Sequence, residues 1–149
     1  MLLRPGKGGD ELKLGKLMPE IRRVLGPPPS VKKGPDFRIY WVYRNLGIDC
    51  MFSVRSERLL SLFLFAEGAD GHTKAAQVTT DRGVLLGDKR SKVLRVYGRP
   101  DLKDESFVTA DGDYVREWYS YHSGIGFHFG KDARVEMISI FAPRRTQAA

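Results

Sequence analysis

Residues 21–28 read Ile21-Arg22-Arg23-Val24-Leu25-Gly26-Pro27-Pro28, and residues 93–100 read Val93-Leu94-Arg95-Val96-Tyr97-Gly98-Arg99-Pro100. Each stretch follows a Leu-Gly step, Leu14-Gly15 in the first case and Leu86-Gly87 in the second. The offset between the two stretches is constant at 72 residues, as from Gly26 to Gly98. Internal self-similarity of this kind indicates that one structural unit occurs twice.

Two later segments repeat at a slightly larger offset. Residues 41–52 match residues 118–129 at an offset of 77, beginning with a tryptophan in each copy, and residues 62–65 match residues 138–141 at an offset of 76. Positions that both copies keep are expected to form the scaffold. Positions that differ are the ones at which a partner would be recognised.

Each copy is expected to begin with a short amphipathic helix. In the first copy Pro19 suits the first helical turn, apolar residues follow at helical spacing, and Gly26 with the prolines after it ends the helix. The second helix ends in the same way at Gly98. Three strands are expected after each helix, because their residues are aromatic, β-branched or alternately apolar: 37–44, 48–54 and 59–65 in the first copy, and 114–121, 125–129 and 135–141 in the second.

These elements predict an α+β fold in which two tandem helix–β-meander repeats form one antiparallel sheet with the helices packed on one face. We expect a single domain over 1–149, with repeat one at 10–65, a linker at 66–82 and repeat two at 83–142. Halves of about 70 residues would bury little surface alone. The face against the helices is expected to hold the side chains that match between copies, Ile48/Ile125, Cys50/Phe127, Phe52/Phe129, Leu62/Ile138 and Leu64/Ile140.

The other face of the predicted sheet does not match between the copies. A sheet with helices on one side leaves its other side free, and an exposed apolar patch there marks a contact surface. This unmatched face is therefore where a partner is expected to bind. It holds Asp49, Met51, Ser53, Ser61 and Phe63 in the first copy, and Gly126, His128, Met137 and Ser139 in the second.

The bulk composition is that of a basic globular protein. The chain has 149 residues, a formal net charge of +7 and a pI near 9.7, which favours an acidic partner, nucleic acid or a membrane surface. It has no apolar run of about 18 residues, so no membrane span is expected, and its first residues lack a signal-peptide core. We expect a cytoplasmic protein unless a leader precedes this sequence. The single Cys50 is expected to be a buried, inert thiol.

Few residues point to catalysis or to a metal. His122 and His128 are six residues apart with no cysteine or acid at ligand spacing, so zinc is not expected. Asp111 and Asp113 flank a glycine and favour a hairpin over a calcium loop, because the downstream glutamate ligand is absent. Residues 6–9, Gly-Lys-Gly-Gly, lack the ending and the preceding strand of a phosphate loop and are interpreted as a flexible N-terminal arm. No enzyme activity and no cofactor are expected.

Four aromatic residues differ in how they compare between the copies. Trp41 and Trp118 match at the offset of 77, which favours a structural anchor over a base-stacking role. Tyr119 and Tyr121 match a valine and an arginine at the same offset, so these tyrosines are candidates for a specific contact. Tyrosine supplies a large contact area at a low entropic cost.

The order of a Leu-Gly step, a short helix, Gly-x-Pro, then Trp…Gly-Ile and a meander resembles the β-lactamase inhibitor protein superfamily. It is also similar to the small lipoproteins of the outer-membrane barrel-assembly machinery, whose single module carries a Gly…Val…Gly-x-Pro signature. The resemblance covers about residues 10–65 and 80–142. It implies a non-enzymatic module that grips its target with a concave, aromatic-rich sheet face. On that face the resemblance places Met51, Phe63, Tyr119, Tyr121, His128 and Met137.

Two hypotheses for the function follow. The first is a protein-binding module, of inhibitor or immunity type, that contacts a partner with an acidic surface through the open sheet face. The alternative is a nucleic-acid-binding protein that uses scattered Lys and Arg with exposed aromatics, and its affinity would fall steeply with salt. The superfamily's members are secreted or lipid-anchored, whereas this sequence shows no signal, no lipidation cysteine near its start and no disulfide pair, so their target is not carried over.

Overall fold

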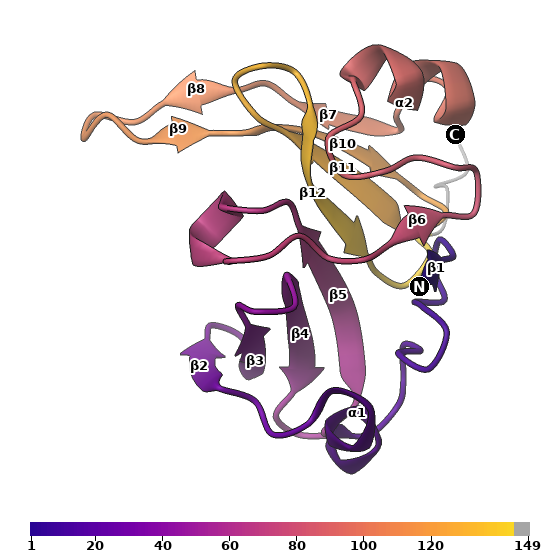
Figure 1. Ribbon diagram of the computed structural model, residues 1–149, viewed down its shortest axis with the longest axis vertical. Helices are drawn as coiled ribbons and strands as arrows, with labels where there is room; N and C mark the ends of the chain where they lie inside the picture. Colours follow the sequence, from indigo (N-terminus) through magenta and orange to yellow (C-terminus); the bar gives the residue numbers. More distant parts are fainter. Residues whose placement is uncertain (145–149) are drawn as a thin grey trace.

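One eight-stranded antiparallel sheet dominates the computed structural model, which describes residues 1–144 (Figure 1). The strand order is β2-β3-β4-β5-β12-β11-β10-β7. The first copy supplies α1 (Met18–Leu25), β2 (Ser30–Gly34), β3 (Arg38–Tyr43), β4 (Ile48–Ser53) and β5 (Leu59–Phe65). The second copy supplies α2 (Arg90–Tyr97), β7 (Leu102–Asp104), β10 (Glu117–Tyr121), β11 (Ile125–Phe129) and β12 (Val135–Ile140).

Shorter elements lie outside this sheet. The N-terminal β1 (Leu2–Leu3) pairs in parallel with β6 (Thr79–Thr80) of the linker, and the linker also contains the 3₁₀ turn η1 (Ala69–Gly71). An insert in the second copy forms a two-stranded hairpin of β8 (Phe107–Val108) and β9 (Tyr114–Val115). The Asp-Gly turn expected at 111–112 is at the tip of this hairpin, where Gly112 donates to the carbonyl of Thr109 at 2.9 Å.

The central strands β5 and β12 relate the two copies by an approximate two-fold axis. Leu62 lies opposite Ile140, and Leu64 lies opposite Ile138. The sequence offset of 76 relates Leu62 to Ile138 and Leu64 to Ile140, so a rotation that exchanges the copies also exchanges these two pairs. The copies are therefore halves of one continuous sheet.

The predicted α+β class is wrong, because the protein is sheet-dominated. Strands take up about 40% of the described chain and helix only 13%, and the two α-helices have eight residues each. The Gly-x-Pro step ends each helix after two turns, and each copy then forms a strand that the sequence analysis did not predict, β2 or β7. The sheet grows to eight strands, while the helices are too short to be stable without it.

The Leu-Gly step and the last strand of each copy are joined by the same contacts. The amide of Gly15 donates to the carbonyl of Leu59, the first residue of β5, at 2.8 Å. The amide of Gly87 donates to the carbonyl of Val135, the first residue of β12, at 2.8 Å. The guanidinium of Arg58 donates to the carbonyl of Gly15 at 2.8 Å, as Arg134 does to the carbonyl of Gly87 at 3.0 Å. Both glycines have φ of +89°, a left-handed conformation that glycine adopts without strain.

The end of each helix is held by a tyrosine of the sheet. The Tyr43 hydroxyl donates to the carbonyl of Gly26 at 2.9 Å, and the Tyr121 hydroxyl donates to the carbonyl of Gly98 at the same distance. Burial raises the pKa of each tyrosine to about 12, so both hydroxyls stay protonated donors at physiological pH. The repeated glycine after each helix therefore has a second role, because its carbonyl fixes the helix to the sheet.

The main core lies on one face of the sheet, as the matched positions predicted. Ile21 of α1 and Val93 of α2 are fully buried there. They pack with the ten side chains that match between the copies, Ile48, Cys50, Phe52, Leu62, Leu64, Ile125, Phe127, Phe129, Ile138 and Ile140. The expected burial of Cys50 is confirmed, because its side chain is 0% exposed, and this burial raises the pKa of the thiol.

The N-terminal segment also belongs to this core, so the expectation of a flexible arm is wrong. Leu3 and Leu12 are buried in the same cluster as the helices. The amide of Gly6 donates to the carbonyl of Gly124 at 3.1 Å, which ties the glycine-rich loop to the turn between β10 and β11. None of the helices within residues 1–144 is long and apolar enough to cross a membrane.

Candidate protein-binding face of the sheet

The face opposite the helices carries the side chains that differ between the copies. The register of the sheet assigns each residue to a face, because side chains alternate along a strand. On this open face lie Tyr40 and Val42 of β3, Asp49, Met51 and Ser53 of β4, Ser61, Phe63 and Phe65 of β5, Met137 and Ser139 of β12, Gly126 and His128 of β11, and Trp118 and Ser120 of β10.

Four of the six predicted contact residues lie on the open face, where all four are half-buried: Met51, Phe63, His128 and Met137. Tyr40 lies opposite Met51, and its ring is 6.5 Å from that of Phe63. Met137 lies opposite Phe65 on one side and His128 on the other. The four residues thus span β4, β5, β12 and β11, across the junction of the two copies.

The placement of Tyr119 and Tyr121 on the open face is wrong. Both lie on the helix side, and they are only 4% and 5% exposed. Tyr119 lies opposite Phe127, just as Trp41 lies opposite Cys50, so Tyr119 is the structural equivalent of Trp41. Tyr121 is likewise the equivalent of Tyr43.

The error comes from the lengths of two turns. Four residues, 44–47, join β3 to β4, whereas three residues, 122–124, join β10 to β11. A fixed offset of 77 therefore misaligns β3 with β10, the strands that precede the turn, by one residue. An error of one residue assigns every side chain of a strand to the wrong face. The matched tryptophans are not equivalent: Trp41 lies in the core cluster, and Trp118 lies on the open face at the position of Tyr40.

Trp118 is a candidate contact residue that the sequence analysis interpreted as a structural anchor. Its ring stacks on that of His128 with centroids 5.5 Å apart and planes 20° apart. A Cβ at Gly126 would lie 2.5 Å from both Trp118 Nε1 and Ser139 Oγ, so only glycine leaves room for the indole here. Within the described chain Trp118 Nε1 and Ser120 Oγ are buried without a hydrogen-bond partner. Buried polar atoms are usually paired, and these two are unpaired donors on the face that differs between the copies.

The centre of this cluster is uncharged. Burial, together with the positive charge of Arg116, lowers the pKa of His128 to about 3. The imidazole is therefore neutral at physiological pH, and Ser139 Oγ lies 3.5 Å from its Nε2. A neutral histidine beside a tryptophan and a methionine suits an apolar contact better than it suits acid–base chemistry.

The linker covers one part of the open face. His72, which is 1% exposed, stacks on Phe65 with ring centroids 4.0 Å apart. Its Nε2 lies 2.8 Å from Asp49 Oδ1, and its Nδ1 lies 2.9 Å from the carbonyl of Ala69. Burial raises the pKa of Asp49. The imidazole therefore fastens the linker to the surface of β4 and β5.

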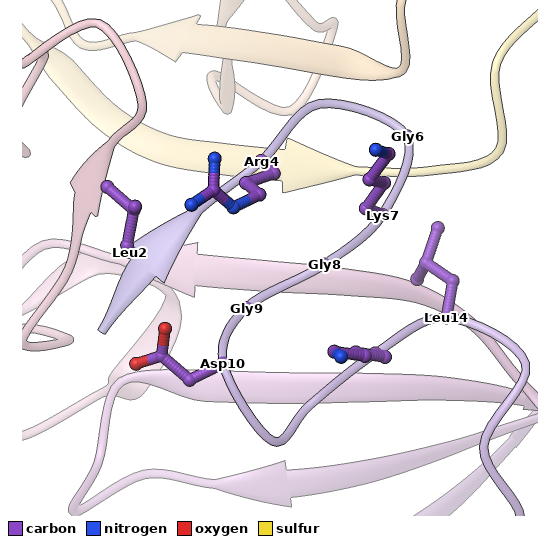
Figure 2. Close-up of a pocket in the computed structure, with 9 residues that line it drawn as sticks. Leu2, Arg4, Gly6, Lys7, Gly8, Gly9, Asp10 and Leu14 are labelled. Atoms are coloured by element: carbon purple, nitrogen blue, oxygen red, sulfur yellow. The ribbon is translucent and has the colours of Figure 1, made fainter.

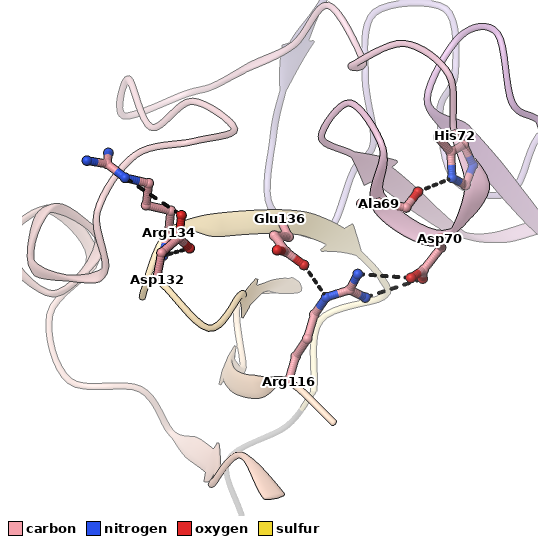
Figure 3. A network of polar contacts seen from close by, with 7 residues as sticks. All are labelled: Ala69, Asp70, His72, Arg116, Asp132, Arg134 and Glu136. Atoms are coloured by element: carbon pink, nitrogen blue, oxygen red, sulfur yellow. Dashed lines mark hydrogen bonds and ion pairs between the residues drawn. The ribbon is translucent and has the colours of Figure 1, made fainter. Parts of the chain in front are cut away.

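Arg116 also connects the linker to the sheet, through two ion pairs (Figure 3). Its guanidinium lies between Asp70 of η1, at 2.9 Å, and Glu136 of β12, at 2.7 Å. The ion pairs connect the linker to the strands of the second copy, while His72 connects it to the first. The uncovered part of the open face, around Met51, Phe63 and Met137, is thus bordered by a fixed segment.

The glycine-rich loop at residues 6–9 offers no phosphate cradle. It borders a pocket of about 510 Å³ that Arg4, Lys7, Asp10 and Lys13 also line (Figure 2). A phosphate cradle requires free backbone amides. The amides of residues 6, 7, 8 and 9 all donate to backbone carbonyls at 3.1–3.2 Å.

The charge is distributed unevenly along the chain. Residues 1–29, which include α1, hold six Lys or Arg and three Asp or Glu, for a net charge of +3. Residues 82–99, which include α2, hold six Lys or Arg and one Asp, for a net charge of +5. Residues 101–113 hold five Asp or Glu and one Lys, for a net charge of −4. The two segments that carry the helices are therefore basic, and the insert of the second copy is acidic.

Comparison with known proteins identifies the fold alone. No family model and no curated protein matches the chain. An extracellular protein containing an SCP domain from Bacillus anthracis str. Ames is similar, with a TM-score of 0.57 and 12% identity over 91% of this chain and 47% of that one. So is a cysteine-rich secretory protein from Staphylococcus aureus subsp. aureus Mu50, with a TM-score of 0.56 and 13% identity over 95% and 50% of the two chains.

A third solved structure matches over nearly its whole length. It is a DUF4309 family protein from Bacillus subtilis subsp. subtilis str. 168, with a TM-score of 0.53 and 14% identity over 92% of this chain and 88% of that one. The present chain spans about half the length of the first two structures. The resemblance to the β-lactamase inhibitor protein superfamily stays a prediction.

Proposed function

We propose that this protein is a non-enzymatic binding module, of inhibitor or immunity type, that contacts another protein through the open face of its sheet. The observation that carries the proposal is the apolar strip formed by Met51, Phe63 and Met137, which crosses the junction of the two copies. These side chains are half-buried although both helices pack on the other face. Apolar surface left in this way marks a contact site.

The chemistry of the strip fits a protein partner. Methionine side chains adapt to irregular apolar surfaces, and Phe63 with Trp118 supplies the aromatic area that dominates binding energy at interfaces. The net charge of +7 would draw the protein toward a partner with an acidic surface before contact.

The proposal is tested by capture with matched variants. Phe63→Asp places a charge on the open face, and Val24→Asp places the same charge on an exposed apolar position of α1. Tagged proteins are incubated with extract and with culture medium of the native cell, since two of the similar structures are named as extracellular or secretory. We expect one protein to be captured by the native chain and by Val24→Asp, and to be lost with Phe63→Asp at an unchanged melting temperature. Capture that survives Phe63→Asp contradicts the proposal.

Nucleic-acid binding through the helix side is a second candidate, and the charge distribution favours it. The segments that carry α1 and α2 have net charges of +3 and +5, and a basic surface of this kind attracts phosphate backbones. Fluorescence anisotropy with a labelled DNA or RNA strand at low and high salt tests this candidate. Affinity that falls steeply with salt and is lost in Arg22→Glu/Arg95→Glu supports it. Absence of binding at low salt eliminates it.

A further inference from the structure

The β8–β9 hairpin is present in only one of the two copies. In the first copy residues 35–37 join β2 to β3 directly, whereas in the second copy residues 105–116 lie between β7 and β10 and contain the hairpin. Figure 1 shows the hairpin projecting beyond the end of the sheet. We call residues 105–115 the acidic hairpin, because they hold three Asp or Glu and no Lys or Arg, for a net charge of −3.

The acidic hairpin exposes apolar side chains. Phe107 is 57% exposed and Val108 is 64% exposed, and Val115 lies opposite Phe107 with more than a third of its surface in solvent. A two-stranded hairpin alone is marginally stable in water, and this one leaves its apolar pair unpacked. Exposed apolar residues within an acidic segment indicate a docking element for a surface that is apolar and basic.

The opposite edge of the sheet carries such a surface. We call it the Phe37 end and define it as residues 31–38 and 54–58, around the β2–β3 turn. These segments hold five Lys or Arg and two Asp or Glu, for a net charge of +3. Phe37 is 61% exposed, the guanidinium of Arg55 lies 4.3 Å from its ring centroid, and Val54 is also exposed.

The backbone at the Phe37 end is strained. Phe37 has φ of +58°, and so does Asp36 beside it. A bulky residue in the left-handed region is uncommon and strained. The strain holds an aromatic ring in solvent with the exposed Arg55 over it, and such strain gathers at sites of contact.

We propose that the protein associates head to tail, with the acidic hairpin of one copy docked on the Phe37 end of a second copy. Phe107 and Val108 would pack on Phe37 and Val54, and the acidic side chains of the hairpin would face Lys33, Arg38 and Arg55. The two surfaces differ and lie at opposite edges of the sheet, so the contact is heterologous. A row of associated copies has a free acidic hairpin at one end and a free Phe37 end at the other. The charges on both surfaces are exposed, so salt weakens the association.

Sedimentation velocity over a concentration series tests the association. We expect the weight-average sedimentation coefficient to rise with concentration up to about 0.5 mM at low salt, and the rise to be smaller in about 1 M salt. A coefficient that stays at the monomer value over the whole range contradicts the proposal. Phe63→Asp should leave the series unchanged, so a failure here is distinct from a failure of the binding function proposed for the open face.

Two variants test the geometry of the contact. Phe107→Ser removes one surface and Phe37→Ser removes the other; both residues are exposed, so each variant keeps its circular dichroism spectrum. Each variant alone should stay monomeric. An equimolar mixture should form heterodimers, because the intact hairpin of Phe37→Ser can dock on the intact Phe37 end of Phe107→Ser. Self-association of Phe37→Ser alone, or a mixture that stays monomeric while the native protein associates, overturns the head-to-tail arrangement.

Discussion

Phe63 lies directly opposite Ser139 in the central pair of strands, and each is the equivalent of the other at the offset of 76. In a fully symmetric sheet, two identical side chains would face each other at this point. Here an aromatic ring faces a hydroxyl. The scaffold keeps its two-fold relation on the helix side and loses it at the centre of the open face, where the proposed partner binds.

The tyrosine contacts at the two helix ends should contribute equally to stability. Tyr43→Phe and Tyr121→Phe each remove one hydroxyl that donates at 2.9 Å to a glycine carbonyl. We expect each to lower the free energy of unfolding by about 1 kcal/mol, and the double variant to show the sum. Urea unfolding measures all three. A lower free energy of unfolding in only one of the two single variants would mean that the two contacts do not stabilise the fold equally.

Gly126→Ala should disturb the open face and leave the core intact. The added Cβ would meet Trp118 Nε1 and Ser139 Oγ at 2.5 Å, so we expect a loss of about 1–3 kcal/mol in the free energy of unfolding. Trp118 should move, and the tryptophan emission spectrum should change. The variant Gly126→Ala/Trp118→Phe, in which a smaller phenyl ring without a donor replaces the indole, is expected to recover part of the loss. An unchanged emission spectrum would contradict the packing of the indole over Gly126.

The contact between His72 and Asp49 holds one proton. The carbonyl of Ala69 only accepts, so His72 Nδ1 carries a proton. The 2.8 Å contact between Nε2 and Oδ1 requires one further proton between the two groups. Burial raises the pKa of Asp49, so the folded state holds a proton at this contact to a higher pH than an exposed aspartate would. The stability that this proton contributes is present below about pH 4 and is lost as pH rises through the raised value.

Asp49→Asn isolates this effect. The asparagine amide does not titrate and can still hydrogen-bond the imidazole of His72. We expect the free energy of unfolding of Asp49→Asn to fall less than that of the native protein as pH rises from about 4 to about 7. Parallel profiles would show that no shared proton is present.

His128 should produce the opposite dependence. Its pKa of about 3 in the folded state lies below the ordinary value, so the folded state resists protonation. Stability is present above about pH 6.5 and is lost as pH falls toward the folded value, by at most about 1.4 kcal/mol for each pH unit. His128→Gln should flatten the acid side of the profile and leave the alkaline side unchanged. A histidine resonance that titrates near pH 6.5 for His128 would contradict its burial.

The scaffold could be predicted from the sequence because both copies carry its residues at matching positions. The matched positions Ile48/Ile125 and Leu62/Ile138 are core, and the Leu-Gly and Gly-x-Pro steps are fixed to the sheet by the same contacts in each copy. The strands β2 and β7 were missed because they are exposed edge strands rich in charge, and edge strands need no alternating apolar pattern.

The open face could be predicted only in part. Apolar and polar residues alternate clearly along β4, β5, β11 and β12. Counting every second residue therefore assigned four residues to the open face correctly: Met51, Phe63, His128 and Met137. The tyrosines and Trp118 lie ahead of a turn that is one residue shorter than its counterpart, and a fixed offset carries no information about turn length. Aligning Gly47 with Gly124 only reproduces the offset of 77. Aligning Tyr43 with Tyr121 gives an offset of 78 ahead of the turn, which pairs Trp41 with Tyr119 as the structure does.

The most direct test of the central claim is the affinity of the captured partner for Phe63→Ser, which makes the central pair of the open face symmetric with Ser139. Isothermal titration calorimetry gives the Kd for the native protein, Phe63→Ser and the helix-side control Val24→Asp. An aromatic anchor at the centre of an interface contributes about 2 kcal/mol, so we expect a Kd raised about 30-fold for Phe63→Ser and unchanged for Val24→Asp. A Kd for Phe63→Ser within about 2-fold of the native value, with the fold intact, would contradict the assignment of the open face as the binding surface.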